Sequence, residues 1–138
     1  MYVHMAAMFL GMIVLQVFIM PFAMTASPSH AYFSLSQGYM GAFMGAAMLA
    51  IDGLFHPVEW WFWVAVAVAA GLSIAAFRGQ WFVSDREYLH EMVPHHSMAL
   101  LTSRPRMRSQ NPKIARLAHQ ITLTQEREIA EMKEMLLA

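Results

Sequence analysis

The chain has 138 residues, of which 58% are hydrophobic and only 13% are charged, and its formal net charge is zero. A soluble domain is typically about 45–50% apolar and about 25% charged, so this composition indicates an integral membrane protein. Zero net charge gives no electrostatic basis for binding nucleic acid. The absence of cysteine excludes disulfides, thiolate zinc sites and iron–sulfur clusters.

The charged residues are confined to one part of the chain. All nine Lys and Arg residues lie at Arg78 or later, and the only acids before that point are Asp52 and Glu59. We therefore predict an all-α protein with a transmembrane region over residues 1–80 and a polar helical region over residues 84–138.

The first apolar segment covers residues 1–25, has no charged residue, and is long enough to cross a hydrocarbon core of roughly 30 Å as a helix. Pro21 lies near its end, where a kink costs least. A cleavable signal peptide ending near Ala26 is the alternative, but no basic segment precedes the apolar run. We interpret the segment as an uncleaved span.

Two more spans are predicted, over residues 36–55 and 58–77. The earlier one contains Gly41-x-x-x-Gly45, a spacing that lets two membrane helices approach closely. Aromatic residues flank the later one and mark the two membrane interfaces: Trp60, Trp61, Trp63, Trp81 and Phe82. Three spans put the two termini on opposite sides, and Arg78 with Arg86 favours a cytoplasmic C-terminal region by the positive-inside rule.

Methionines form a stripe along each of the first two predicted spans, at steps of three and four residues. The members are Met1, Met5, Met8 and Met12 in the first span, and Met40, Met44 and Met48 in the second. If the stripes face each other, they form a thioether-lined seam of the kind that a cuprous ion prefers. Methionine is also an adaptable apolar filler, so ordinary packing is the alternative interpretation.

The polar region is predicted to form a hairpin of two helices, over residues 85–103 and 112–137. Ser84 and Glu87 have the capping-box spacing that begins the first helix, and Pro94 inside it is expected to cause a kink. Asn111 and Pro112 begin the second helix, which carries one apolar face. Since two helices bury little apolar surface, we expect the hairpin to pair with a second copy as a four-helix bundle, in a homodimer or higher oligomer.

The first hairpin helix carries a cluster of candidate metal ligands. Met92 is three residues from His95 and four from His96, so their side chains can share one face, and His90 and Met98 lie beside them as weaker candidates. Imidazole and thioether together suit copper, while two imidazoles alone would also accept zinc or nickel. A solvated surface helix is the alternative.

These residues also carry a resemblance. Met92-Val93-Pro94-His95-His96, followed by Gln125-x-x-Glu128-Ile129-x-x-Met132, resembles the signature of the DUF305 family. That family consists of bacterial, ferritin-like helical proteins, some of which bind copper and are linked to copper tolerance. The resemblance covers about residues 88–137, but the chain has one hairpin where others have two. It also has a three-span anchor in place of a secretion signal, as in a membrane-bound subset. The resemblance implies that five residues face one another inside the bundle: Met92, His95, His96, Glu128 and Met132.

We therefore predict a membrane-anchored copper-binding protein of the bacterial inner membrane that stores, buffers or delivers the ion. The alternative is an accessory subunit of a larger membrane complex with no metal role. No nucleophile–base pair, phosphate loop or carboxylate dyad is visible, so we expect no enzyme; a ferritin-like redox enzyme would need two Glu-x-x-His motifs. Ligands without cysteine favour a periplasmic hairpin, whereas the charge rule favours a cytoplasmic one.

Overall fold

The computed structural model describes residues 1–138 and is helical throughout, with no strand, which confirms the all-α prediction. The chain divides into two compact units. The first comprises Met1–Ile19 and Ser34–Val83, and the second comprises Met20–Phe33 and Ser84–Ala138.

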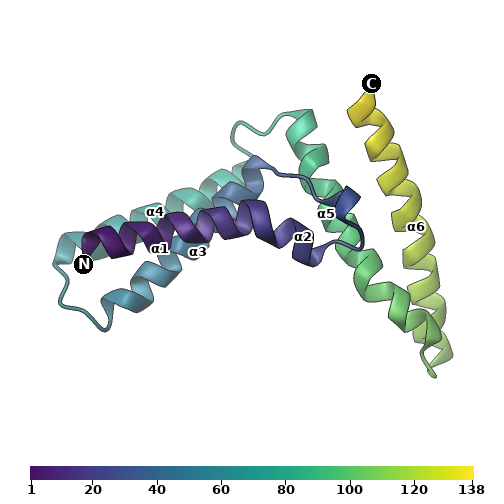
Figure 1. Cartoon of the computed structure of the whole chain (residues 1–138), viewed down its shortest axis with the longest axis horizontal. Coiled ribbons are helices and arrows are strands. Elements are labelled where there is room, and N and C mark those ends of the chain that lie inside the picture. The colour runs from purple at the N-terminus through teal and green to yellow at the C-terminus, as the bar shows by residue number, and fades with distance from the viewer. The chain divides into compact units, whose positions relative to one another are not determined.

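The first unit consists of three helices that run side by side (Figure 1). These are α1 (Tyr2–Val14), which a π-helical turn (Leu15–Ile19) continues, α3 (Leu35–Gly53) and α4 (Trp60–Gly79). The middle helix, α3, packs against both α1 and α4. Its start is fixed by a capping box, in which the Ser34 hydroxyl accepts from the Gln37 backbone N–H and the Gln37 side chain accepts from the Ser34 N–H.

Two helices are long and apolar enough to cross a membrane, Tyr2–Met24 and Trp60–Gly79, on grounds of length and composition alone. The structure therefore supports two apolar candidate spans where the sequence predicted three. The helix that differs is α3, which carries polar residues and many glycines and alanines. Small residues suit its place between two neighbours, because they let helix backbones approach closely, but they lower its hydropathy.

The glycine pair of α3 makes the close approach that its spacing predicted. A Cβ atom added at Gly41 would lie 2.8 Å from the Cα of Ile13, and one at Gly45 would lie 2.8 Å from Cδ2 of Phe9. Both contacts are shorter than real Cβ atoms allow, so only glycine permits α1 and α3 to lie this close. The buried core of the unit continues from this contact to α4 and consists of Met5, Ala46, Phe62 and Val66.

The π-helical turn Leu15–Ile19 precedes α2 (Met20–Met24), which contains the buried Pro21. Proline has no N–H to donate, and its ring collides with the carbonyl four residues earlier, which belongs to Val17 in this turn. A π-turn is one of the ways in which a helix accommodates such a clash. The disturbance expected at Pro21 thus takes the form of a local π segment.

The second unit is built on the predicted hairpin of α5 (Asp85–Ser103) and α6 (Pro112–Leu137), joined by a 3₁₀ turn, Arg104–Arg108 (Figure 1). The Ser84 hydroxyl accepts from the Glu87 N–H at 3.3 Å and begins α5. The Asn111 side chain accepts from the Lys113 N–H at 3.0 Å and begins α6. α5 continues unbroken through the buried Pro94.

The core of the hairpin is apolar and is partly covered by another segment of the same chain. Val93 and Leu100 of α5 meet Ile129 and Met132 of α6, and Ala26 and Tyr32 pack against this cluster. From the sequence, we expected only a second copy of the chain to bury the apolar surface of the hairpin. In the structure, the segment Met20–Phe33, which we expected to be mostly span and turn, buries part of that surface within one chain.

Candidate metal centre

The closest pair among the predicted ligands joins the two hairpin helices. His96 projects from α5 and Glu128 from α6, and the His96 Nδ1 atom lies 3.0 Å from the Glu128 Oε2 atom. The imidazole is 18% exposed and the carboxylate 38%, so the pair lies at the edge of the helix interface and is reachable from solvent.

The contact is close, yet it leaves the imidazole nitrogen without a hydrogen bond. Nδ1 of His96 is buried and has no hydrogen-bond partner, because the carboxylate oxygen lies outside the direction of a ring hydrogen bond despite the short distance. Glu128 Oε2 instead accepts from the Gln125 side-chain amide at 3.3 Å. In the tautomer that carries its hydrogen on Nε2, the Nδ1 atom has a lone pair that a cation can bind.

The spacing of the two donor atoms also fits joint coordination. A nitrogen and an oxygen bound to one ion at the tetrahedral angle, at typical bond lengths of about 2.0–2.2 Å, would lie about 3.4 Å apart. His96 Nδ1 and Glu128 Oε2 lie 3.0 Å apart, so a side-chain movement of about 0.4 Å would let both atoms bind one ion. The two residues present therefore fit neighbouring ligands of a single metal ion.

Two methionines of the predicted set lie in the adjoining core. Met132 is buried in the hairpin cluster, and Met92 is half-buried against it. Met92 lies four residues before His96 on α5, and Met132 lies four residues after Glu128 on α6, so each thioether shares a helix face with one donor of the pair.

The other predicted ligands of the hairpin lie elsewhere. His95 is exposed, and its ring centroid is 6.1 Å from that of His96. His90 stacks on Tyr32, with ring centroids 5.1 Å apart and an interplanar angle of 17°. Met98 is half-buried. No three His, Asp or Glu side chains of the chain gather in a group that could hold a metal ion.

The methionines of the two predicted stripes lie in different surroundings. Gly41 and Gly45 form the face of α3 that touches α1, whereas Met44 and Met48 are 42% and 40% exposed. Met5 is buried in the core of the first unit. Met1 is exposed, and the remaining stripe members Met8, Met12 and Met40 are half-buried.

Sequence reasoning missed a hydrogen-bonded link between α5 and the segment Met20–Phe33. Ser97 is fully buried, and its Oγ accepts from the Ala26 backbone N–H at 2.8 Å and lies 2.8 Å from His30 Nδ1. The two contacts join the serine hydroxyl to the backbone and to a side chain of the same segment. The burial of Ser97 could have been predicted from the sequence, because Ser97 shares a helix face with the apolar residues Val93 and Leu100.

The surroundings of His30 favour its neutral form. Burial lowers the pKa of His30 below its ordinary value, and the positive charges of Lys133 and Arg104 lower it further. A serine–histidine pair can act as a nucleophile and base. Here the serine is inaccessible, so the pair ties the segment Met20–Phe33 to α5.

Comparison with known proteins finds a family match over the hairpin. Residues 74–138 match the model of DUF305, a domain of unknown function, which confirms the resemblance. An uncharacterized protein of Acanthamoeba polyphaga mimivirus is 42% identical over 66 residues, which are 47% of this chain and 43% of that protein. The match thus spans less than half the length of the viral protein. No solved structure matches the chain.

Proposed function

Because residues 74–138 match the DUF305 family, we propose that this chain is a membrane-anchored protein that binds a copper ion in its hairpin and stores, buffers or delivers it. The observation that carries the proposal is the His96–Glu128 pair. A buried imidazole nitrogen without a hydrogen bond lies 3.0 Å from a carboxylate oxygen, and both residues fall within the matched region.

The chemistry of the donor set favours copper. No third His, Asp or Glu joins the pair, and the thioethers of Met92 and Met132 lie in the adjoining core on the same helix faces. Thioether sulfur selects the cuprous ion over zinc and other harder divalent ions. The exposed His95 is a donor at the surface through which the ion would enter or leave. Ion binding without catalysis is the function that these residues support.

The first unit is the proposed anchor. It contains Trp60–Gly79 and most of Tyr2–Met24, the two helices that are long and apolar enough to cross a membrane. We propose that α3 crosses with them, since it packs against both α1 and α4 and has 19 residues. The family resemblance favours the bacterial inner membrane as the location. Lipid would cover the large apolar side chains exposed on α4: Val64, Val68, Leu72 and Ile74.

We also propose that the hairpin pairs with a second copy. The segment Met20–Phe33 covers only part of it, and apolar side chains near the turn between α5 and α6 stay exposed. Leu101, Ile114 and Leu117 are 44%, 44% and 52% exposed. Pairing of two hairpins through these residues would form the four-helix bundle typical of ferritin-like proteins.

The metal proposal is tested by measuring cuprous-ion affinity of the purified full chain in detergent, in competition with a colorimetric chelator. We expect one ion per hairpin. His96→Ala and Glu128→Gln should each weaken binding by more than about tenfold, the loss typical of removing even an indirect partner of a metal ligand.

The matched control is His119→Ala, which removes an exposed imidazole from α6 and should leave the affinity unchanged. Equal weakening by all three substitutions would mean nonspecific histidine binding. A wild-type chain that binds neither copper, zinc nor nickel at micromolar concentrations would contradict the proposal and favour the accessory-subunit alternative.

A further inference from the structure

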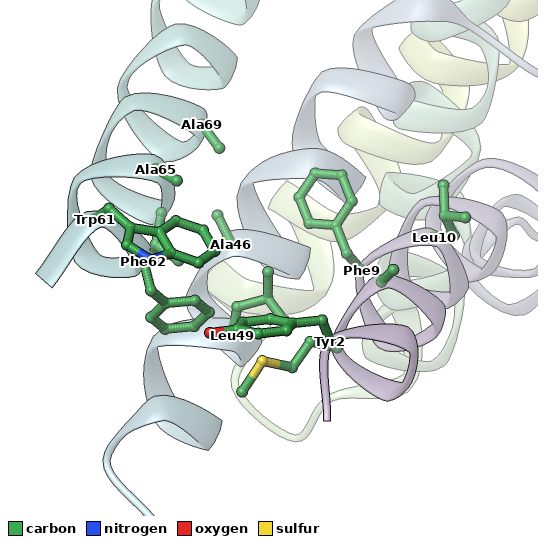
Figure 2. A pocket seen from close by; sticks show the side chains of 12 residues that line it. Tyr2, Phe9, Leu10, Ala46, Leu49, Trp61, Phe62, Ala65 and Ala69 are labelled. Carbon is green, nitrogen blue, oxygen red and sulfur yellow. The ribbon is translucent and has the colours of Figure 1, made fainter. Parts of the chain in front are cut away.

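The first unit contains an apolar pocket of about 470 Å³ between α1 and α4, with α3 as its floor. Figure 2 shows Phe9 and Leu10 on one side, Ala65 and Ala69 on the other, and Ala46 and Leu49 from α3. The pocket is partly open, and its side chains are apolar apart from the polar tips of Tyr2 and Trp61.

The pocket exists because α1 and α4 pack on the same middle helix and meet each other mainly through one aromatic pair. The rings of Tyr2 and Trp61 are 5.5 Å apart and inclined at 35°. Beyond this pair, small side chains from both helices line the space, namely Ala6, Ala65 and Ala69. Helices that carried large residues at these positions would fill the volume themselves.

The lining decides what chemistry can occupy the pocket. Water needs two to four polar partners to be held in a cavity, and this pocket offers almost none. An empty pocket would leave its lining atoms without dispersion contacts. The occupant is therefore apolar.

The surroundings decide between two apolar occupants. Both walls belong to helices that are candidate spans, Tyr2–Met24 and Trp60–Gly79, so in a membrane the open side of the pocket faces hydrocarbon. An acyl chain of the bilayer then lies beside the opening, whereas a second copy of the chain would lose translational and rotational freedom on associating. The pocket thus suits an acyl chain better than a helix from a second copy.

We propose that the pocket holds one acyl chain of a membrane phospholipid, as a resident part of the first unit. This rests on the membrane-anchoring part of the proposed function, since both walls belong to helices that are candidate spans. Tyr2 and Trp61 lie at the end of the pocket where α1 and α4 meet, and the Trp61 indole N–H donates to Glu59 Oε2 at 2.7 Å. Amphipathic rings of this kind lie at the headgroup level, so the acyl chain extends from them past Phe9 and Ala69.

The test is photo-crosslinking of the full chain in phosphatidylcholine vesicles in which the lipid carries a diazirine on its acyl chain, with adducts located by mass spectrometry. We expect adducts on the pocket residues Phe9, Ala65 and Ala69 as well as on outward-facing residues of α4. Ala65→Trp, which fills the pocket, should reduce the adducts on Phe9 several-fold. The adducts on Leu72 should stay unchanged.

The matched control is Ala67→Trp, because Ala67 lies on α4, is exposed and does not line the pocket. Ala6→Phe fills the same space from α1 and keeps the test informative if Ala65→Trp fails to fold, as judged by circular dichroism.

Adducts on Leu72 with none on the pocket residues would overturn this proposal but leave membrane anchoring intact. Crosslinks between two protein chains at Phe9 would replace the lipid with a second copy. Absence of any acyl adduct would reject the anchoring itself.

Discussion

The two units of the chain have opposite arrangements of small, large and charged residues. In the first, the contacts between helices rest on small residues such as Gly41, Gly45 and Ala46, while large apolar side chains such as Val64 and Leu72 point outward. In the second, large apolar residues form the interior and the charged residues lie outside; every Lys and Arg except Arg78 belongs to it.

The difference fits the proposed surroundings of the two units, lipid for the first and water for the second. In water, burying large apolar side chains supplies most of the stabilisation. In lipid that driving force is absent between helices, and close packing of small residues replaces it. The two units are therefore expected to be damaged by opposite kinds of substitution, deletion of side-chain volume in the second and addition of volume in the first.

The largest effect is expected from deletion in the hairpin core. Leu100 is only 1% exposed and lies in the cluster with Val93 and Ile129. Leu100→Ala should lower the free energy of unfolding of the second unit by about 2–5 kcal/mol, because it removes buried contacts and leaves a cavity. Hydrogen exchange of α5 and α6 amides in the full chain measures this loss.

The matched control is Leu72→Ala on α4, where the leucine is 56% exposed. In detergent micelles it should change the exchange of α4 amides only slightly, since the detergent covers the outward face in both variants. A loss at α4 as large as that at α5 would show that Leu72 is packed against protein, and the proposed contrast between the units would fail.

A smaller effect is expected from addition of volume in the first unit. Gly41→Leu places side-chain atoms where the backbone of Ile13 already lies, since even a Cβ would be 2.8 Å from its Cα. We expect a destabilisation of about 1–3 kcal/mol, the usual cost of overpacking, with α1 displaced from α3. Thermal unfolding in detergent measures the destabilisation.

Gly38→Leu is the control, because a Cβ at Gly38 meets nothing within 4 Å although it lies one turn earlier in the same helix. If Gly38→Leu and Gly41→Leu destabilise equally, the cost comes from helix propensity or detergent binding. The close contact between α1 and α3 would then contribute nothing measurable.

The parts of the fold that depend on local signals were predictable from the sequence. Ser84 and Asn111 begin α5 and α6 through side-chain caps that a few neighbouring residues define. The Gly41-x-x-x-Gly45 spacing likewise predicted a close helix contact that depends only on the absence of side chains. The partner of that contact, α1, could not be read from the glycines themselves.

The parts that depend on long-range contacts were not predictable. Ala26 and His30 lie about seventy residues from Ser97 in sequence, and nothing in the turn around Pro28 indicates that it covers α5. From the sequence, the adjacent residues His95 and His96 were equally good candidates for metal ligands. In the structure they point about 100° apart around the helix, so only His96 meets Glu128.

The smallest effect concerns pH and the link between Ser97 and His30. Burial, followed by Lys133 and Arg104, lowers the pKa of His30 in the folded chain, whereas in the unfolded chain it is near 6.5. Between these two values the unfolded state binds more protons, so the stability of the second unit increases with pH there and decreases on acidification below about pH 6.5. The effect is limited because His30 is only half-buried and Glu126, paired with Arg104 at 3.0 Å, offsets part of the positive charge.

Hydrogen exchange of the α5 amides at about pH 7.5 and about pH 5.5, corrected for the intrinsic exchange rates, isolates this contribution. His30→Gln cannot titrate and should lose less stability on acidification than the wild type does. His119→Gln, which removes an exposed imidazole from α6, should lose as much as the wild type. If His30→Gln instead follows the wild type, protonation of His30 is not coupled to unfolding of the second unit.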